Sequence, residues 1–208
     1  MKLRSIMTSA FGVAVLSQLA APASAVSLIN EDFGTGLADS FNISTGTTIG
    51  AFDVSAGNID LIGNNGGFDL YPGNGNYIDL NGNTTGAITS TGSFTFANGG
   101  ILSFDYGTNG APTSANVFLG TTLLGALTNP SGAAFSNQSY SIASGTTGAL
   151  SFVSTNSGFG GIVLDNILLS STDVPATAVP EPFTMIGTLI GGTAAIRLRK
   201  KLKVDSNV

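Results

Sequence analysis

Ile101-Leu102-Ser103-Phe104-Asp105-Tyr106 is the stretch that decides the fold. Leu102, Phe104 and Tyr106 fall at every second position, and a polar residue separates each pair. Successive side chains of a β-strand point to opposite faces of the sheet. The alternation therefore predicts a strand with one buried face and one solvated face.

Comparable apolar segments recur on both sides of this strand, and clusters of Gly and Asn separate them. The segments are Asn58–Ile62, Tyr77–Leu80, Ala87 through Phe96, Ala149–Val153 and Ile162–Leu168. Asn-Gly pairs begin at positions 65, 81, 98 and 109 and indicate tight turns. With 29 Gly and only 9% charged residues, the sequence predicts an all-β fold, an antiparallel β-sandwich.

Positive charge is absent from the middle of the chain, where no Lys or Arg lies between Val26 and Ile196. Nucleic acids bind proteins by releasing counterions to Lys and Arg, so an acidic domain of this kind predicts no nucleic-acid partner. The chain also contains no His and no Cys, which excludes catalytic triads, thiol nucleophiles and the usual zinc sites. Carboxylate chemistry and divalent cations are what remain.

The N-terminal residues have the order of a secretory signal. Lys2 and Arg4 precede an apolar stretch from Ile6 to Leu19, and Ala23 and Ala25 form an A-x-A cleavage site. A transmembrane anchor is the alternative, but the apolar stretch is short and polar residues interrupt it. We therefore predict a signal helix over 1–25 that signal peptidase removes, followed by a sandwich domain over 26–169.

The C-terminal residues combine a proline motif, an apolar run and a basic end. A Ser/Thr/Pro linker over 170–178 leads to Pro180-Glu181-Pro182, to the apolar run 183–196, and to a basic cluster that ends at Lys203. As a helix this run spans roughly 21 Å, short of a hydrocarbon core of about 30 Å. We predict a sorting tail over 179–203 with a short transmembrane helix in the inner membrane, and a polar end over 204–208. The basic cluster stays in the cytoplasm, so the domain lies on the far side.

The motif Pro180, Glu181 and Pro182, with the helix and the basic end behind it, resembles the PEP-CTERM sorting tail of bacterial surface proteins. The resemblance implies that an exosortase cuts the chain near this motif and that the domain is released or transferred to the cell surface. A permanent tail anchor is the alternative interpretation. The short length of the run and its Gly and Thr residues weigh against it.

The middle domain resembles the DUF642-like, choice-of-anchor group of bacterial surface domains. The specific stretches are Tyr77-Ile78-Asp79-Leu80-Asn81-Gly82 and Leu164-Asp165-Asn166-Ile167. The resemblance implies a galactose-binding-like jelly roll, a sugar ligand and a structural Ca²⁺. In such folds calcium joins the loop after the first strand to the final strand, where this chain has Glu31, Asp32 and Asp165.

One Gly-rich loop combines aromatic residues, which stack on sugar rings, with amides and carboxylates, which bind hydroxyl groups. The candidate ligand-binding residues are Asp69, Tyr71, Asn74, Asn76 and Tyr77, with Phe68 beside them. The competing interpretation is that Phe68 and Tyr77 pack in the core and that the polar residues form a turn.

Together these features predict an exported, non-catalytic protein of the cell surface or extracellular matrix, with polysaccharide as its candidate ligand. Two alternatives stay open at this point. The first is a secreted glycan-acting hydrolase that uses Asp carboxylates, although the sequence shows no recognisable pair of them. The second is a structural matrix component that binds no glycan and associates with itself.

Overall fold

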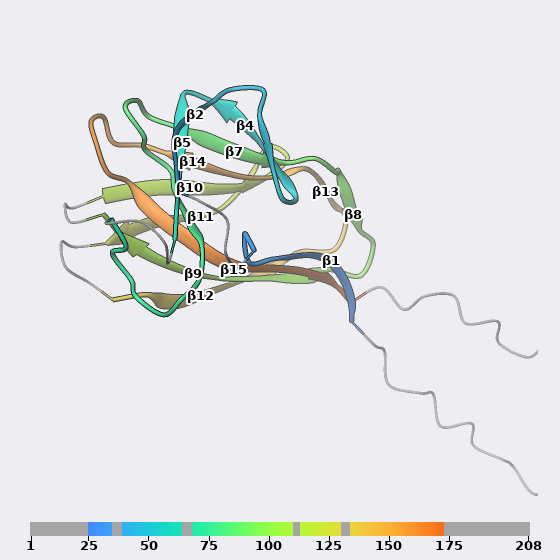
Figure 1. Cartoon of the computed structure of the whole chain (residues 1–208). Helices are drawn as coiled ribbons and strands as arrows, with labels where there is room; N and C mark the ends of the chain where they lie inside the picture. The colour runs from blue at the N-terminus through green and yellow to red at the C-terminus, as the bar shows by residue number, and fades with distance from the viewer. Residues whose placement is uncertain (1–24, 35–38, 64–67, 110–112, 130–133, 173–208) are drawn as a thin grey trace, which may run out of the picture.

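The computed structural model describes residues 25–34, 39–63, 68–109, 113–129 and 134–172, which form fifteen β-strands (Figure 1). Seven strands make one antiparallel sheet, sheet A. Its order is β12 (Ser136–Ile142), β9 (Gly100–Thr108), β15 (Ile162–Ser171), β6 (Tyr77–Asp79), β5 (Asn58–Ile62) and β2 (Ser40–Ser44), and β1 (Val26–Glu31) also pairs with β15.

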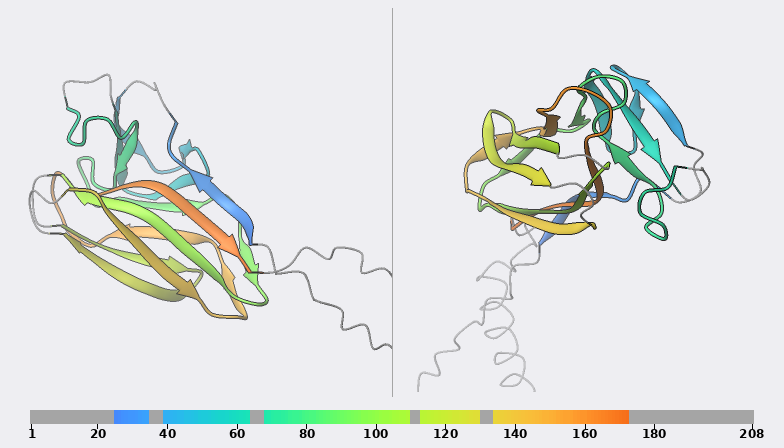
Figure 2. Two further views of the ribbon diagram at one scale, coloured as in Figure 1. Left: turned by 90° about the horizontal axis from the view of Figure 1, so that it is seen from below. Right: turned by 90° about the vertical axis from the view of Figure 1, so that its left-hand side faces the viewer.

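Six strands make the second sheet, sheet B. Its order is β11 (Thr122–Asn129), β10 (Thr113–Leu119), β14 (Leu150–Ser154), β7 (Ala87–Ser90), β4 (Phe52–Ala56) and β3 (Thr48–Ile49). A small two-stranded sheet pairs β8 (Phe94–Phe96) with β13 (Thr146–Gly148). Figure 2 shows the two large sheets as the layers of a sandwich.

The strand order within the sandwich is that of a jelly roll. Sheet A contains the order β6-β15-β9-β12, and sheet B contains β7-β14-β10-β11. The last strand of this eight-stranded unit thus lies between its first and third strands, as in two packed Greek keys. The predicted all-β antiparallel sandwich is confirmed, and β2 to β5 extend both sheets at one side.

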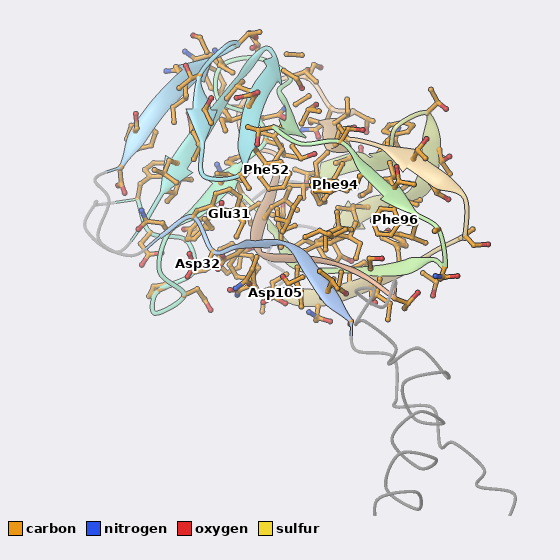
Figure 3. All side chains as sticks on the ribbon, turned by 90° about the vertical axis from the view of Figure 1, so that its right-hand side faces the viewer. Glu31, Asp32, Phe52, Phe94, Phe96 and Asp105 are labelled. Carbon is orange, nitrogen blue, oxygen red and sulfur yellow. The ribbon has the colours of Figure 1, made fainter. Side chains whose placement is uncertain are left out.

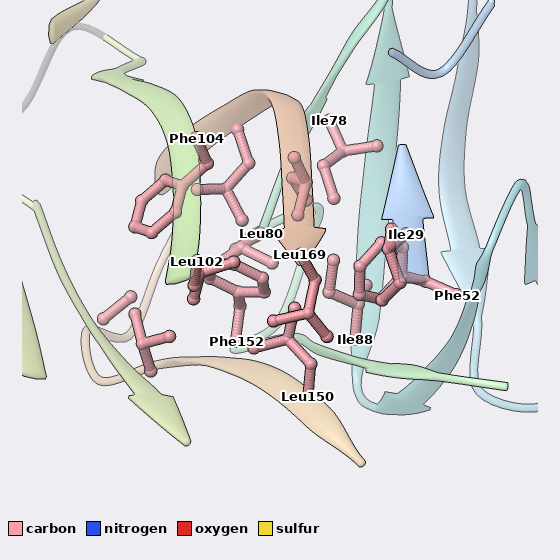
Figure 4. Packing of buried hydrophobic residues seen from close by; sticks show 14 of the residues in the cluster. Ile29, Phe52, Ile78, Leu80, Ile88, Leu102, Phe104, Leu150, Phe152 and Leu169 are labelled. Atoms are coloured by element: carbon pink, nitrogen blue, oxygen red, sulfur yellow. The ribbon is translucent and has the colours of Figure 1, made fainter. Parts of the chain in front are cut away.

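The core lies between the two sheets because alternate side chains of the strands point toward it. In β10, Thr113, Ala115, Val117 and Leu119 are buried and the residues between them are only partly so. Figure 4 shows Leu102 and Phe104 of β9 packed toward Leu150 and Phe152 of β14. Phe104 meets Phe152 edge to face with ring centroids 5.1 Å apart, so one aromatic pair joins the two sheets.

Strand β15 changes partner along one of its sides. Val163 and Leu164 pair with β6, whereas the residues from Ile167 onward pair with β1. A register shift between Asp165 and Leu168 separates the two halves, and Asn166 has φ of 51° there. This bulge brings the end of β1, with Glu31, next to Asp165.

The predicted signal over 1–24 and the predicted tail from 173 onward lie outside the described residues. Ala23, Pro180, Glu181 and Pro182 are therefore not described, while Ala25 is an exposed residue before β1. Across the part of the chain that the structure describes, no helix is long and apolar enough to cross a membrane.

Candidate ligand-binding surface

The loop before β6 holds the residues that the sequence predicts to bind a ligand, and the structure encloses two of them. The Tyr77 side chain is 0% exposed and that of Asn76 is 1% exposed. Tyr77 packs with Ile62 and Val163 in a second, smaller apolar cluster. The competing interpretation of Tyr77 as a core residue is therefore the one that the structure supports.

The hydroxyl group of Tyr77 organises the loop from inside. It accepts hydrogen bonds from the backbone N–H of Leu70 at 2.6 Å and of Tyr71 at 3.3 Å, and it donates one to Asp69 Oδ1 at 3.1 Å. Burial raises the pKa of Tyr77 above its ordinary value, so the hydroxyl group keeps the proton that it donates. Asp69 also accepts the N–H of Tyr71 at 3.1 Å, which confirms its interpretation as a turn-forming residue.

Tyr71 fastens the same loop to β9. Its hydroxyl group donates to the carbonyl of Thr108 at 2.7 Å and accepts the N–H of Thr108 at 2.8 Å. Its ring lies against Phe135 with centroids 4.2 Å apart. A Cβ atom at Gly107 would come within 2.5 Å of the Tyr71 hydroxyl oxygen, so the close approach requires glycine. Tyr71 is thus an anchor of the loop.

Asn74 shapes the turn at the tip of the loop. Its backbone N–H and its Nδ2 both donate to the carbonyl of Tyr71, at 3.2 Å and 2.9 Å. Four of the five residues predicted to bind a ligand, Asp69, Tyr71, Asn74 and Tyr77, use polar groups to hold the loop itself.

The outer side of this region carries an aromatic pair, which we call the aromatic platform: Phe41 of β2 and Phe68 of the loop. Phe41 is 50% exposed and Phe68 is 55% exposed. Their rings meet edge to face, with centroids 6.2 Å apart and an interplanar angle of 79°. The interpretation of Phe68 as a core residue is therefore wrong, and Phe41 was not among the residues predicted from the sequence.

Strands β2 and β5 carry two amide side chains in this region, the exposed Asn42 next to Phe41 and the half-buried Asn58 opposite Ser44. Asn42, which has φ of 56°, donates its N–H to Asp60 Oδ1 at 2.7 Å. The N–H of Asn83 lies 3.0 Å from Asn42 Oδ1 and 2.8 Å from Asn58 Oδ1. The side-chain carbonyl oxygens of Asn42 and Asn58 are thus engaged within the protein, and each amide keeps its nitrogen as a donor group.

A buried polar network centres on Asp79 of β6, which is 0% exposed. Asp79 accepts hydrogen bonds from the N–H of Asn81 at 2.8 Å and from Asn109 Nδ2 at 2.7 Å. Burial raises the pKa of Asp79 to about 6, and the hydrogen bonds oppose this change only in part. Asn81 Nδ2 donates to the carbonyls of Asn156 and Gly158. The Asp-Leu-Asn stretch therefore ties β6 to the loop before β15.

Glu31 and Asp32, at the end of β1, lie near the bulge of β15 that carries Asp165, and Figure 3 shows Glu31 and Asp32 on the same side of the sandwich as Asp105. Burial, and then the charges of Asp105, Asp32 and Glu31, raise the pKa of Asp165 to about 7. Both carboxylate oxygens of Glu31 accept backbone N–H groups, from Phe33 at 2.8 Å and Ala51 at 2.6 Å.

Among the described residues, no three acidic side chains have the spacing of a metal site. Asp165 and Asp32 supply the hard oxygen donors that calcium prefers, whereas Glu31 is occupied by the backbone. Calcium binding by Glu31, Asp32 and Asp165 stays a prediction.

No family model and no curated protein matches this chain. Among solved structures, it is similar to the K1 cleaved adhesin domain of Lys-gingipain from Porphyromonas gingivalis W83, with 16% identity, a TM-score of 0.45, and coverage of 71% of this chain and 98% of that chain. It is also similar to a point variant of CBM29-2, a family 29 carbohydrate-binding module, with 17% identity, a TM-score of 0.42, and coverage of 70% of this chain and 99% of that chain.

A third similar structure is the C-terminal CBM6 of the laminarinase LamC from Zobellia galactanivorans, with 12% identity, a TM-score of 0.38, and coverage of 69% of this chain and 98% of that chain. Similarities this low carry no argument about function.

Proposed function

We propose that this chain is an exported, non-catalytic protein of the cell surface or extracellular matrix that binds polysaccharide through its aromatic platform. The observation that carries the proposal is the exposed pair of Phe41 and Phe68. Two large aromatic rings exposed by about half are costly to leave in water, and aromatic faces stack on the apolar faces of hexopyranose rings. The neighbouring amides of Asn42 and Asn58 supply partners for sugar hydroxyl groups.

The rigidity of the loop supports this role. Phe68 belongs to a loop that Tyr71 and Tyr77 fasten to β9 and to the second apolar cluster. A platform held in place before the ligand arrives loses less conformational entropy on binding. The predicted ligand residues Tyr71, Tyr77 and Asn76 thus act behind the surface, and Phe41 and Phe68 make the contact.

The burial of the perturbed carboxyl groups weighs against the hydrolase alternative. A glycosidase acid must reach the glycosidic oxygen. Asp79 and Asp165 have raised pKa values near neutrality, yet they are 0% and 2% exposed. Desolvation is the largest cause of these pKa values, and neither carboxyl group lies at an open surface.

The binding proposal predicts that Phe41→Ala and Phe68→Ala each weaken binding to a soluble hexopyranose polysaccharide at least about tenfold, because each removes one stacking ring. The full chain, purified in mild detergent, would first be screened on a glycan array. Titration of the strongest ligand then compares the variants. Phe159→Ala is the matched control, since Phe159 is 80% exposed and lies in the loop before β15.

Unchanged binding in the Phe41→Ala, Phe68→Ala double variant would contradict the proposal that the aromatic platform binds polysaccharide. An assay for new reducing ends runs alongside the titration. Release of reducing ends from the bound polysaccharide would show a hydrolase instead. Thermal melting of each variant separates loss of binding from loss of folding.

Export is the second part of the proposal, and it rests on the two ends of the sequence. We propose that signal peptidase cuts after Ala25 and that an exosortase cuts near Pro180, Glu181 and Pro182. The expected surface form therefore begins at Val26 and lacks the basic cluster, as mass spectrometry of the released protein would show.

Replacing the three motif residues by alanine should leave the full tail in the membrane fraction. Recovery of a full-length chain from the cytoplasm would contradict this part of the proposal and leave the binding test unaffected.

A further inference from the structure

Charge is unevenly distributed over the sandwich. No charged residue lies between Asp105 and Asp165. This stretch contains the strands β10 to β14, so the side of the sandwich formed by β11 and β12, the neutral side, carries no charged residue of its own. One charge borders it, because Asp105 of β9 pairs with Asn137 of β12 and accepts a hydrogen bond from Asn137 Nδ2 at 2.9 Å. All charged residues in the described ranges are acidic, and each lies at or before Asp105 or at Asp165.

Strand β12 is the edge of sheet A on the neutral side (Figure 1). It pairs with β9 through seven consecutive positions, from Ser136↔Tyr106 to Ile142↔Gly100, without a register shift. No other described strand pairs with its outer side. An antiparallel strand directs alternate backbone N–H and C=O groups to each side. β12 therefore presents a straight row of donors and acceptors on its outer side.

Two other edges of the sandwich are interrupted, whereas β12 is not. Proteins protect edge strands with Lys, Pro, inward charges or bulges. At the opposite edge of sheet A, the pairing of β2 shifts register between Ser40 and Ile43. At the edge of sheet B, the pairing of β11 with β10 shifts between Val117 and Phe118. The sequence of β12, Ser-Asn-Gln-Ser-Tyr-Ser-Ile, has no such protection.

Tyr140 closes the core behind this edge. The centroid of its ring lies 6.1 Å from the centroid of the Phe104 ring. A Cβ atom at Gly125 of β11 would come within 2.5 Å of the same ring, so the glycine makes room for it. With the apolar interior covered in this way, what β12 offers to a partner is its backbone, together with the exposed side chains of Ser136, Ser139 and Ser141.

We propose that β12 is an interface between two copies of this chain, in which the two β12 strands pair antiparallel and join both A sheets into one. A second copy fits because its own β12 is equally neutral. Two purely acidic domains repel each other where their charged strands meet, and the neutral side is where that repulsion is weakest. Pairing of a strand with itself is isologous, so it closes at a dimer.

The absence of Cys from the chain allows a direct test by disulfide trapping. Single variants Ser136→Cys, Ser139→Cys and Ser141→Cys would be oxidised in the full chain, purified in mild detergent. Directly opposite residues of antiparallel strands have Cα atoms about 4.5–5.5 Å apart, which suits a disulfide. We expect the variant nearest the two-fold axis to form at least about ten times more covalent dimer than the matched control Ser44→Cys, which is exposed on the bulged edge strand β2.

Sedimentation velocity provides a readout without oxidation. The wild-type chain should show a concentration-dependent dimer. Ser139→Lys should shift it toward the monomer, because it places like charges at the interface, and Ser44→Lys should not. The proposal would be overturned by a monomer at every concentration or by assemblies larger than a dimer. It would also be overturned if no β12 cysteine variant gave more covalent dimer than Ser44→Cys. Polysaccharide binding is scored separately, so its failure leaves this test intact.

Discussion

Replacing Phe104 by alanine is expected to lower the free energy of unfolding by about 3–5 kcal/mol. Phe104 is 0% exposed, and its ring is the meeting point of the two sheets. The centroid of its ring lies 5.1 Å from that of Phe152 in sheet B and 6.1 Å from that of Tyr140 in the edge strand β12. Truncation removes these contacts and leaves a cavity that the surrounding strands cannot fill, since their backbones are held by hydrogen bonds.

Thermal melting measures the effect, which corresponds to a fall in Tm of roughly 10 °C for a domain of this size. Phe104→Leu should lose a smaller part of the stability, because it keeps most of the apolar volume. Phe159→Ala is the control, since it removes an exposed ring of the same kind. Equal melting temperatures for Phe104→Ala and Phe159→Ala would contradict the placement of Phe104 between the sheets.

A second large effect is expected from pH, with the domain more stable at pH 5 than at pH 8 when calcium is chelated. Burial raises the pKa of Asp79 to about 6 and that of Asp165 to about 7, both from an ordinary value of 3.8. A carboxyl group with a raised pKa binds its proton more tightly in the folded state than in the unfolded state. The stability that it contributes is therefore full below pH 3.8 and is lost as the pH rises through 6 and 7.

The change in the free energy of unfolding depends on how far the pH falls below each folded-state pKa. For each pH unit below its folded-state pKa, and down to its unfolded-state pKa, a carboxyl group adds about 1.4 kcal/mol to the free energy of unfolding. Between pH 8 and pH 5, protonation of Asp79 should therefore add about 1.4 kcal/mol, and Asp165 adds to it in the same direction. Asp79→Asn and Asp165→Asn should each flatten the dependence of Tm on pH. A wild-type domain that melts at a lower temperature at pH 5 than at pH 8 would contradict the burial of these charges.

The predicted calcium site includes only one of these two carboxyl groups, that of Asp165. If Glu31, Asp32 and Asp165 hold the ion as predicted, calcium at pH 8 removes the repulsion at Asp165 and raises Tm relative to chelator. Asp165→Asn should abolish that rise, and Asp79→Asn should leave it. An unchanged Tm on addition of calcium would contradict the predicted calcium site and would leave the predicted pH dependence unaffected.

The sequence by itself determined the fold class and the charge of the domain. The alternation around Phe104 predicted a half-buried strand, and β9 is that strand. The segments at Asn58–Ile62 and at Ile162 onward became β5 and β15 for the same reason. Side-chain period in a strand is a local property, so it needs no knowledge of the partner strand.

The strands β2 to β4 and β10 to β13 were not predicted from the sequence. β12 carries only Ser, Asn and Gln residues in its first four positions and is exposed along most of its length. An edge strand buries too little to require an apolar alternation. Its neutrality was visible in the sequence, but its position at an open edge was not.

The ligand surface depended on tertiary structure most of all. Phe68 and Tyr77 belong to one Gly-rich segment, where no periodicity separates an inward ring from an outward one. Contact with Ile62 and Val163 buries Tyr77, whereas Phe68 meets Phe41, which lies far away in the sequence. Composition showed that aromatic and amide groups were present there. Which rings face water was decided by the packing of distant strands, because burial is a property of the assembled sandwich and not of any single segment of its chain.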